Sequence, residues 1–238
     1  MSSKLIKQFA VLIFFTLIMT SCGKKSETPQ AAAPKPAPRK VESINRLVTL
    51  NYISELQSLN TSLAGLTTGQ SKIKVDGDLF EASVIVKNAP TFTTHNQAIF
   101  HASRCPEASD DLNADSLIDP VELEKAIGVV LIPLDGDLST QEALIDVLPE
   151  SDGVGNYTYY QSTSFAKMMA DLTAIDPDPK DHLMKLPKNK KFSFDDRIIV
   201  VFGVQPDVYL PPTVDGPVGA ALHDLIPVAC GKYQRLVD

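Results

Sequence analysis

The sequence lacks the short motifs by which most catalytic sites are recognised. It contains no G-x-S-x-G, H-E-x-x-H, G-x-G-x-x-G or phosphate-binding loop signature. Ser164 and Lys167 fit the S-x-x-K pattern of penicillin-binding enzymes, but no K-T-G element exists, and the S-D-N-like stretch 151–153 precedes the serine instead of following it. The pattern therefore favours a helix N-terminus with an exposed lysine over a nucleophile. We expect a protein without enzymatic activity.

Positive charge is scarce in most of the chain. The sequence has 22 basic and 29 acidic residues; residues 1–21 hold two of the basic ones, and residues 22–42 hold five basic and two acidic ones. Residues 43–238 therefore keep 15 basic against 27 acidic side chains, a net charge of −12. Because nucleic acids are bound through a basic footprint, this balance argues against a nucleic-acid partner. It suits a cation site and a well-solvated surface.

The apolar run near the N-terminus is too short to span a membrane as a mature helix. Residues 1–21 have the pattern of an export signal, in which Lys4 and Lys7 precede an apolar run over 9–19. The next residues, Met-Thr-Ser-Cys, end at Cys22 and resemble the lipobox of bacterial lipoproteins. That resemblance implies cleavage before Cys22 and its lipidation, and several acyl chains anchor a protein stably in a bilayer. The alternative is ordinary secretion with a leftover cysteine.

The residues that follow Cys22 predict in which membrane the anchor lies, and they also predict a linker. Gly23 and Lys24, and no aspartate, directly follow the cysteine, so resemblance to bacterial lipoproteins implies the outer membrane of the cell envelope. Residues 23–42 are rich in proline, alanine and lysine, a composition typical of an extended, semi-rigid linker. We therefore expect a signal peptide (1–21), a lipidated cysteine with its linker (22–42) and one globular domain (43–238).

Only three cysteines are present, and one of them is assigned to lipid. Cys105 and Cys230 remain as an even pair in an oxidising compartment, which predicts a disulfide bond. Such a bond would close about 125 residues and contribute roughly 4–5 kcal/mol in the chain-entropy model, as an upper figure. Two free thiols are the alternative.

The hydrophobic pattern of residues 43–238 predicts a mainly β fold. Residues 72–75 and 79–86 flank Asp76-Gly77-Asp78, which is a hairpin signal. Further strands are predicted over 127–132, 156–160 and 197–202. One helix is clear, because Phe165, Met168, Met169 and Leu172 recur at helical spacing behind Ser162 or Thr163 as N-cap. Residues 176–179 and 210–213 are predicted loops, and residues 44–64 fit either a helix or a strand.

The stretch from Asp111 to Glu122 matches the twelve-residue calcium loop of an EF-hand. EF-hand ligands come from positions 1, 3, 5, 7, 9 and 12, where oxygen atoms suit a hard cation. Position 7 contributes a backbone carbonyl, and the glutamate at position 12 binds through both carboxylate oxygens. The predicted Ca²⁺ ligands are Asp111, Asn113, Asp115, Leu117, Asp119 and Glu122. Residues 120–127 can start a short helix, since proline is tolerated in a first helical turn.

Two features separate this loop from a paired EF-hand module. Position 6, normally glycine, is Ser116, which must take a left-handed conformation or distort the loop. The preceding residues 105–111 are too short and turn-like for an entering helix, and the sequence holds no second copy. Ile118 at position 8 is expected to point into the core. A solvated acidic turn that caps a helix is the alternative to a calcium site.

Two histidines raise a different metal possibility. His95 and His101 lie on a predicted strand before Cys105, six residues apart and so on one face. Two imidazoles can bind copper or zinc if further ligands join them. Surface or satisfied core histidines are the alternative.

A series of short segments resembles uncharacterised bacterial lipoproteins distantly similar to chordin-type (CHRD) domains. The segments cover residues 55–235: 59–62, Gly65, 76–78, 95–97, 105–106, 111–122, 133–138, 210–214 and 227–231. Members often carry H-x-Q-H-I-H-G; here His95 and Gln97 match, whereas Ala98 and Phe100 stand at the next histidine positions. Ser116 likewise stands where members tend to have glycine. The resemblance implies a β-sandwich loosely like copper/zinc superoxide dismutases, and no reaction.

These observations predict a membrane-anchored lipoprotein with a β-sandwich-like single domain. One or two short helices and the inserted calcium loop complete the expected domain. The ion would be structural, and the bilayer would be a partner through Cys22. A copper- or zinc-binding redox protein of superoxide dismutase type, using His95 and His101, is the alternative function. The sequence does not identify a protein or small-molecule partner.

Overall fold

A computed structural model describes residues 49–142, 147–175, 183–188 and 192–237. All of them belong to one compact unit, Asn45–Asp238. The strands are β1 (Leu50–Ser58), β2 (Thr68–Asp76), β3 (Leu79–Lys87), β4 (Gln97–Phe100), β5 (Val130–Pro133), β6 (Tyr157–Ser164), β7 (Ile198–Phe202), β8 (Pro227–Lys232) and β9 (Gln234–Leu236). The helices are α1 (Thr61–Ala64), α2 (Pro120–Ile127), α3 (Phe165–Leu172), α4 (Leu222–Leu225) and the 3₁₀ turn η1 (Ala108–Asp110).

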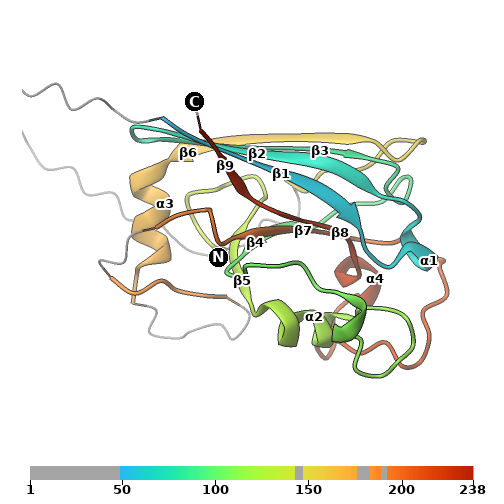
Figure 1. The fold of residues 1–238 in the computed structure, drawn as a ribbon. Coiled ribbons are helices and arrows are strands. Elements are labelled where there is room, and N and C mark those ends of the chain that lie inside the picture. The colour runs from blue at the N-terminus through green and yellow to red at the C-terminus, as the bar shows by residue number, and fades with distance from the viewer. Residues whose placement is uncertain (1–48, 143–146, 176–182, 189–191, 238) are drawn as a thin grey trace, which may run out of the picture. The chain divides into compact units, whose positions relative to one another are not determined.

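The strands form one curled antiparallel sheet, which confirms the mainly β prediction (Figure 1). Their order is β5-β4-β7-β8-β1-β2-β3-β6, with β9 also paired to β1. The curl is made at β1: its residues 51–53 pair with β9, and its residues 57–58 pair with β8. Residues 44–64, which fitted either element type, contain β1 and the single turn of α1.

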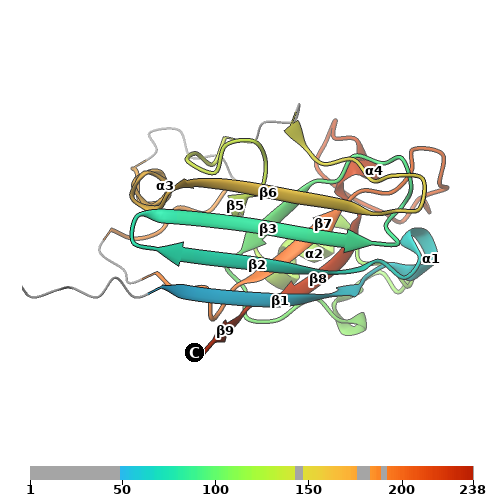
Figure 2. The same ribbon diagram turned by 90° about the horizontal axis from the view of Figure 1, so that it is seen from above.

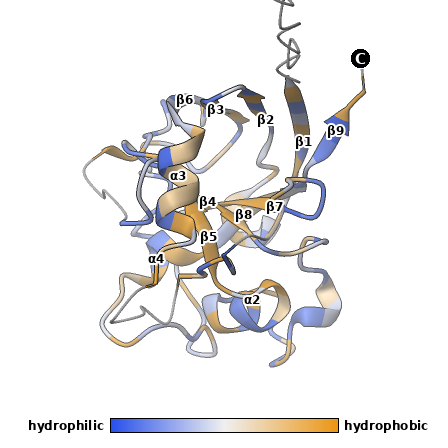
Figure 3. Ribbon diagram, turned by 90° about the vertical axis from the view of Figure 1, so that its left-hand side faces the viewer, coloured by the Kyte–Doolittle hydropathy of each residue, from blue (hydrophilic) through white to orange (hydrophobic). Residues whose placement is uncertain are grey.

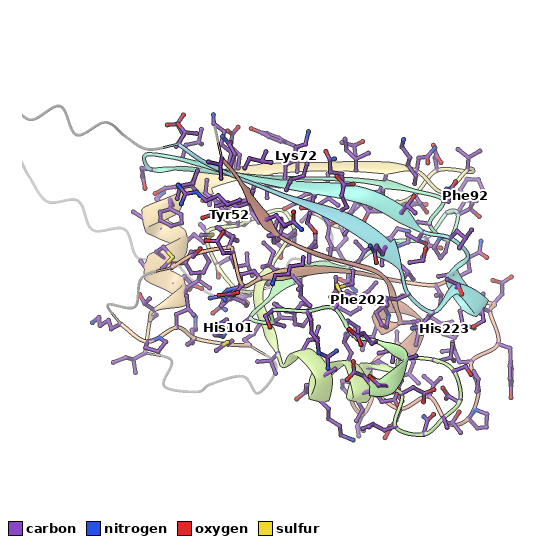
Figure 4. All side chains as sticks on the ribbon, in the orientation of Figure 1. Tyr52, Lys72, Phe92, His101, Phe202 and His223 are labelled. Carbon is purple, nitrogen blue, oxygen red and sulfur yellow. A yellow bond between two sulfur atoms is a disulfide. The ribbon has the colours of Figure 1, made fainter. Side chains whose placement is uncertain are left out.

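The longest strands lie in the half of the sheet that faces solvent (Figure 2). The predicted hairpin is present as β2 and β3, which pair over all nine of their residues around Gly77 at φ 61°. Glycine adopts this left-handed conformation without steric cost. Burial alternates along β3, as expected for a strand with one face on the core. Figure 4 shows the two faces: Lys72 points away from the sheet, and Tyr52 lies on its inner side.

The other half of the sheet is buried on both faces. All five residues of β7 are buried, which explains its continuous run of Ile, Val and Phe. One face of β4, β7 and β8 packs toward the core between the two halves of the sheet, and the opposite face packs against α2. Figure 3 shows hydrophobic residues concentrated on β4, β5 and β7. The second cluster contains Ala98, Phe100, Ile118, Leu123, Ile127, Ile198, Val200, Phe202 and Cys230.

Two predicted boundaries are wrong, for local reasons. The strand predicted over 127–132 begins only at Val130, because α2 continues to Ile127 and ends at Gly128, whose φ is 79°. The N-cap of α3 is Ser164 rather than Ser162 or Thr163, since β6 extends to that residue before the helix begins. The predicted strands at 156–160 and 197–202 are confirmed as β6 and β7.

The predicted loop at 210–213 is confirmed, and 176–179 lies outside the described residues. The predicted signal peptide (1–21), and Cys22 with its predicted linker (22–42), also lie outside them. In the described part of the chain, no helix is both long and apolar enough to cross a bilayer.

Candidate functional site

A disulfide bond fixes the entrance of the predicted calcium loop. Cys105 and Cys230 are bonded, with their Cα atoms 5.9 Å apart and 125 positions between them in sequence, as predicted. Cys230 is on β8, so the bond ties the loop entrance to the middle of the sheet. Next to it, Arg104 holds Asp110 with two hydrogen bonds of 2.6 and 2.8 Å. These bonds lower the pKa of the Asp110 carboxyl to about 2.

The backbone of residues 111–116 turns around the carboxylate of Asp111. Its Oδ1 accepts hydrogen bonds from the N–H groups of Ala114 (2.7 Å) and Asp115 (3.3 Å), and its Oδ2 accepts from Ser116 (2.8 Å). This turn requires left-handed residues: Ala114 has φ 60° and Ser116 has φ 68°. Of the two outcomes predicted for Ser116, the structure therefore has the left-handed conformation.

The end of the loop is a reciprocal cap at the start of α2. Asp119 Oδ1 accepts from the N–H of Glu122 at 2.8 Å, and Glu122 Oε2 accepts from the N–H of Asp119 at 3.1 Å. Glu122 Oε1 also accepts from the N–H groups of Leu112 (2.7 Å) and Asn113 (3.2 Å), which closes the loop. Asp119 and Glu122 are both buried, with exposed fractions of only 2% and 3%. The acidic turn is thus not fully solvated.

Asn60, to which the sequence assigned no role, joins the loop to the sheet. Its Nδ2 donates to the carbonyls of Ile118 (2.8 Å) and Pro227 (3.0 Å), and its Oδ1 accepts from the N–H of Ile118 at 2.7 Å. Asn60 itself is left-handed, with φ 48°, a conformation that asparagine tolerates better than most residues. Ile118 is buried against β4 and β7, as predicted.

A second segment, residues 213–215, contacts the loop from the other side. Thr213 Oγ1 donates to Asp115 Oδ2 at 2.6 Å, and the N–H of Asp215 donates to Asp119 Oδ2 at 3.0 Å. Asn113 Nδ2 donates to the carbonyl of Thr213 at 3.1 Å. The loop is therefore held in place by contacts from three distant parts of the chain.

Within the described ranges, the carboxylates of the loop have backbone partners but no cationic ones. In the described residues, no lysine or arginine forms an ion pair with Asp111, Asp115, Asp119 or Glu122. Nor do any three His, Cys, Asp or Glu side chains of the described ranges converge so as to hold a metal ion. Their oxygens turn instead toward N–H and hydroxyl groups. Within the described residues, the negative charge of the loop is therefore stabilised by hydrogen-bond dipoles and is not neutralised by a cation.

His95 and His101 do not share a strand, which corrects that prediction. His95 lies before β4 and His101 lies directly after it. His95 Nδ1 is 2.9 Å from the carbonyl oxygen of Phe202, and Figure 4 shows Phe202 well separated from His101. His95 is fully buried and stacks on Tyr157 with ring centroids 5.2 Å apart. Burial lowers its pKa, against the opposing effect of the Phe202 and Pro90 carbonyls. His95 Nε2 has no hydrogen-bond partner in the described structure.

Ser164 is placed as a helix cap. Its Oγ accepts from the N–H of Lys167 at 3.2 Å and donates to Asp78 Oδ2 at 2.7 Å. Asp78 Oδ1 also accepts from the N–H of Ala166, and these two bonds lower the pKa of the Asp78 carboxyl. The hydroxyl thus connects α3 to the β2–β3 turn, which accounts for a serine at this position.

Comparison with protein-family models and with curated protein sequences gives no match to this chain.

Proposed function

We propose that the protein is a lipid-anchored component of the bacterial cell envelope whose β-sandwich-like domain binds one structural Ca²⁺ ion. The ion would lie in an EF-hand-like loop, with Asp111, Asn113, Asp115, Leu117, Asp119 and Glu122 as ligands. Cys22 would carry the lipid. The protein would act as a non-enzymatic binding or structural module.

The observation that carries the calcium proposal is the burial of Asp119 and Glu122 beside Asp111 and Asp115 without a cationic partner in the described chain. Buried charges in proteins are usually paired or bound to metal. Backbone N–H groups stabilise these carboxylates, but they leave the net charge of the cluster in place. A divalent cation would neutralise it, and carboxylate oxygens are the ligands that Ca²⁺ prefers.

The left-handed residues at positions 4 and 6 give further support. They wrap the chain around Asp111, as a loop that encloses an ion must do. A groove of about 450 Å³, bordered by Asn60, Asp111 and Ser116, would give a cation access from solvent. Binding requires the carboxylates to rotate from their present partners toward a common centre. The metal-free capped turn is therefore the competing state.

Thermal unfolding with calcium and with chelator tests the proposal, and Asp115→Asn is the most informative variant. The amide keeps the acceptor for the Leu117 N–H (2.9 Å) and can donate to Thr213 Oγ1, so the metal-free hydrogen bonds survive while one negative charge is lost. Asp152→Asn is a matched control, because Asp152 accepts from two backbone N–H groups in a separate turn.

We expect calcium to raise the melting temperature of the wild type and of the Asp152 variant, and to affect the Asp115 variant much less. An equal response in all three proteins, or none, would contradict a calcium site in this loop. Copper and zinc content of the purified protein separates this proposal from the redox alternative, which requires one of those metals.

A further inference from the structure

Two strand edges in the described sheet, those of β5 and β9, are protected against pairing with another chain. The edge of β5 is covered by residues 183–184: Val130 forms a bridge with Leu183, and its carbonyl accepts from the N–H of Met184 at 2.8 Å. Gln141 Nε2 donates to the carbonyl of Leu131 on the same strand at 2.6 Å. The strand β9 is only three residues long and carries Arg235. Short, charged or covered edges of this kind prevent pairing with other chains.

Among the residues that the structure describes, nothing protects the edge of β6 in these ways. β6 pairs with β3 over eight consecutive residues without a register shift, and it is the outermost of the long strands in Figure 2. Within the described residues, β3 is the only strand that pairs with β6, and none of the turn, loop or inter-element backbone hydrogen bonds involves residues 157–164. In an antiparallel edge strand, alternate residues direct their N–H and C=O groups outward. β6 therefore presents a regular row of unpaired donors and acceptors.

The composition of β6 also fits strand pairing. Its sequence, YTYYQSTS, has no charged residue, no proline and no glycine, and it is rich in tyrosine and threonine, which favour strands. Each of the neighbouring strands β1, β2, β3 and β9 contains at least one charged residue. β6 is thus the neutral strip of a solvent-facing half of the sheet that is otherwise charged.

We propose that β6 pairs in antiparallel orientation with β6 of a second copy of this chain, around a two-fold axis at Tyr160. Residues 43–238 carry a net charge of −12, so two copies repel each other, and this repulsion is weakest when they meet along a neutral strip. Antiparallel self-pairing of β6 sets no like charges opposite each other. The same strip offers no charge by which to attract an oppositely charged partner.

The geometry of antiparallel pairing fixes the register. Residues that pair across antiparallel strands point to the same face of the sheet, so a two-fold axis must set a residue opposite itself. Tyr160 is the central outward-facing residue of the strand and is exposed. Its hydroxyl hydrogen-bonds Glu81, which also pairs with Lys74 at 3.3 Å, so the ring is held on the outer face. With Tyr160 opposite itself, Thr158 faces Ser162 of the second copy.

The size of the contact sets its strength. Eight residues span about 27 Å along the strand, which gives an interface at the small end of the known range. We therefore expect a weak, reversible dimer with a Kd of about 10⁻⁴ M in solution. This inference does not depend on calcium binding.

Cysteine cross-linking in cells that express the full chain tests both the contact and the register. Tyr160→Cys should give an oxidant-dependent disulfide dimer, because the two cysteines lie opposite each other. Thr158→Cys and Ser162→Cys are matched controls on the same strand and face. Each would lie about 13 Å from its own copy, beyond the reach of a disulfide, yet the two variants expressed together should cross-link with each other.

A charge at the edge provides the second test. Ser162→Lys in the Tyr160→Cys background should reduce the cross-linked dimer at least about tenfold, since edge lysines oppose strand pairing. Gln57→Lys, an exposed position on β1, should leave the dimer unchanged. Absence of the Tyr160 dimer, equal cross-linking at all three positions, or cross-linking of Tyr160→Cys to a different protein would each overturn the proposal.

Discussion

Asn60 offers the most direct test of how the acidic loop is attached to the sheet. Its side-chain amide makes three hydrogen bonds, to both backbone groups of Ile118 and to the carbonyl of Pro227, in a site only 9% exposed. Asn60→Ala leaves one N–H and two carbonyls without these partners, each at a cost of about 1–3 kcal/mol when no water replaces them. Alanine also adopts the left-handed conformation at a cost of roughly 1 kcal/mol. With partial access of water, we expect a total loss of about 3–5 kcal/mol in the free energy of unfolding.

Two further substitutions at Asn60 separate the hydrogen bonds from the backbone conformation. Asn60→Gly loses the same hydrogen bonds without the left-handed penalty, so it should be about 1 kcal/mol more stable than Asn60→Ala. Asn60→Asp keeps the acceptor for the Ile118 N–H but places carboxylate oxygen against two carbonyls. We expect it to be at least as destabilising as alanine at neutral pH, and to recover part of the loss when acid protonates the carboxyl.

Urea unfolding followed by circular dichroism measures these differences, because the chain has no tryptophan for fluorescence. The order from most to least stable should be wild type, glycine, alanine, aspartate. Losses below about 0.5 kcal/mol for both glycine and alanine, the range of ordinary surface substitutions, would refute the view that Asn60 fastens the loop.

The site and the core give three more predictions. At a calcium concentration ten times the Kd, the wild type should gain about 1.4 kcal/mol, or roughly 3–6 °C in melting temperature, and Asp115→Asn should lose most of that gain in the same calorimetric scan. Replacing Cys105 and Cys230 together by serine should lower the free energy of unfolding by up to about 4–5 kcal/mol; a change below about 1 kcal/mol in urea titrations would mean that the bond constrains the unfolded chain little. Burial lowers the pKa of His95 in the folded protein, so the neutral ring stabilises the fold fully above a pH of about 6.5. As the pH falls from there toward the lowered pKa, the free energy of unfolding should decrease by at most about 1.4 kcal/mol per pH unit. His95→Asn keeps a donor for the Phe202 carbonyl, so its stability should fall less between pH 6.5 and lower pH, and an identical pH profile would exclude His95 as the source.

The parts of the fold that the sequence predicted are those with local causes. The hairpin depends on Gly77 and on alternating residues within nine positions of it. The buried strand β7 is a continuous apolar run, and α2 begins with the proline that the sequence placed in a first helical turn. The disulfide was predictable from cysteine count, since only two cysteines remained after lipidation was assigned.

The parts that escaped prediction depend on partners far away in the chain. Asn60 bonds residues 58 and 167 positions away, and no spacing rule connects them. The division of β1 between β8 and β9 arises from the curl of the whole sheet. The spacing of His95 and His101 fitted one strand, but β4 is only four residues long and lies entirely between the two histidines. The helix N-terminus at Ser164 was predicted, but the N-cap itself was placed one or two residues early, because β6 and α3 meet without a loop and the last strand residue is also the cap.

The attachment of the loop bears on what a bound cation would do. Cys105 fixes the entrance, Asn60 fixes the backbone at Ile118, and Thr213 with Asp215 holds two of the carboxylates. A loop held on three sides has little conformational entropy left to lose on binding, and it also has little freedom to move when an ion enters. The turn around Asp111 is already formed by left-handed Ala114 and Ser116. A cation here would therefore bind to a backbone that is already in place, while the carboxylates turn from their N–H partners toward the ion, which is the behaviour of a structural ion and not of a calcium-driven switch.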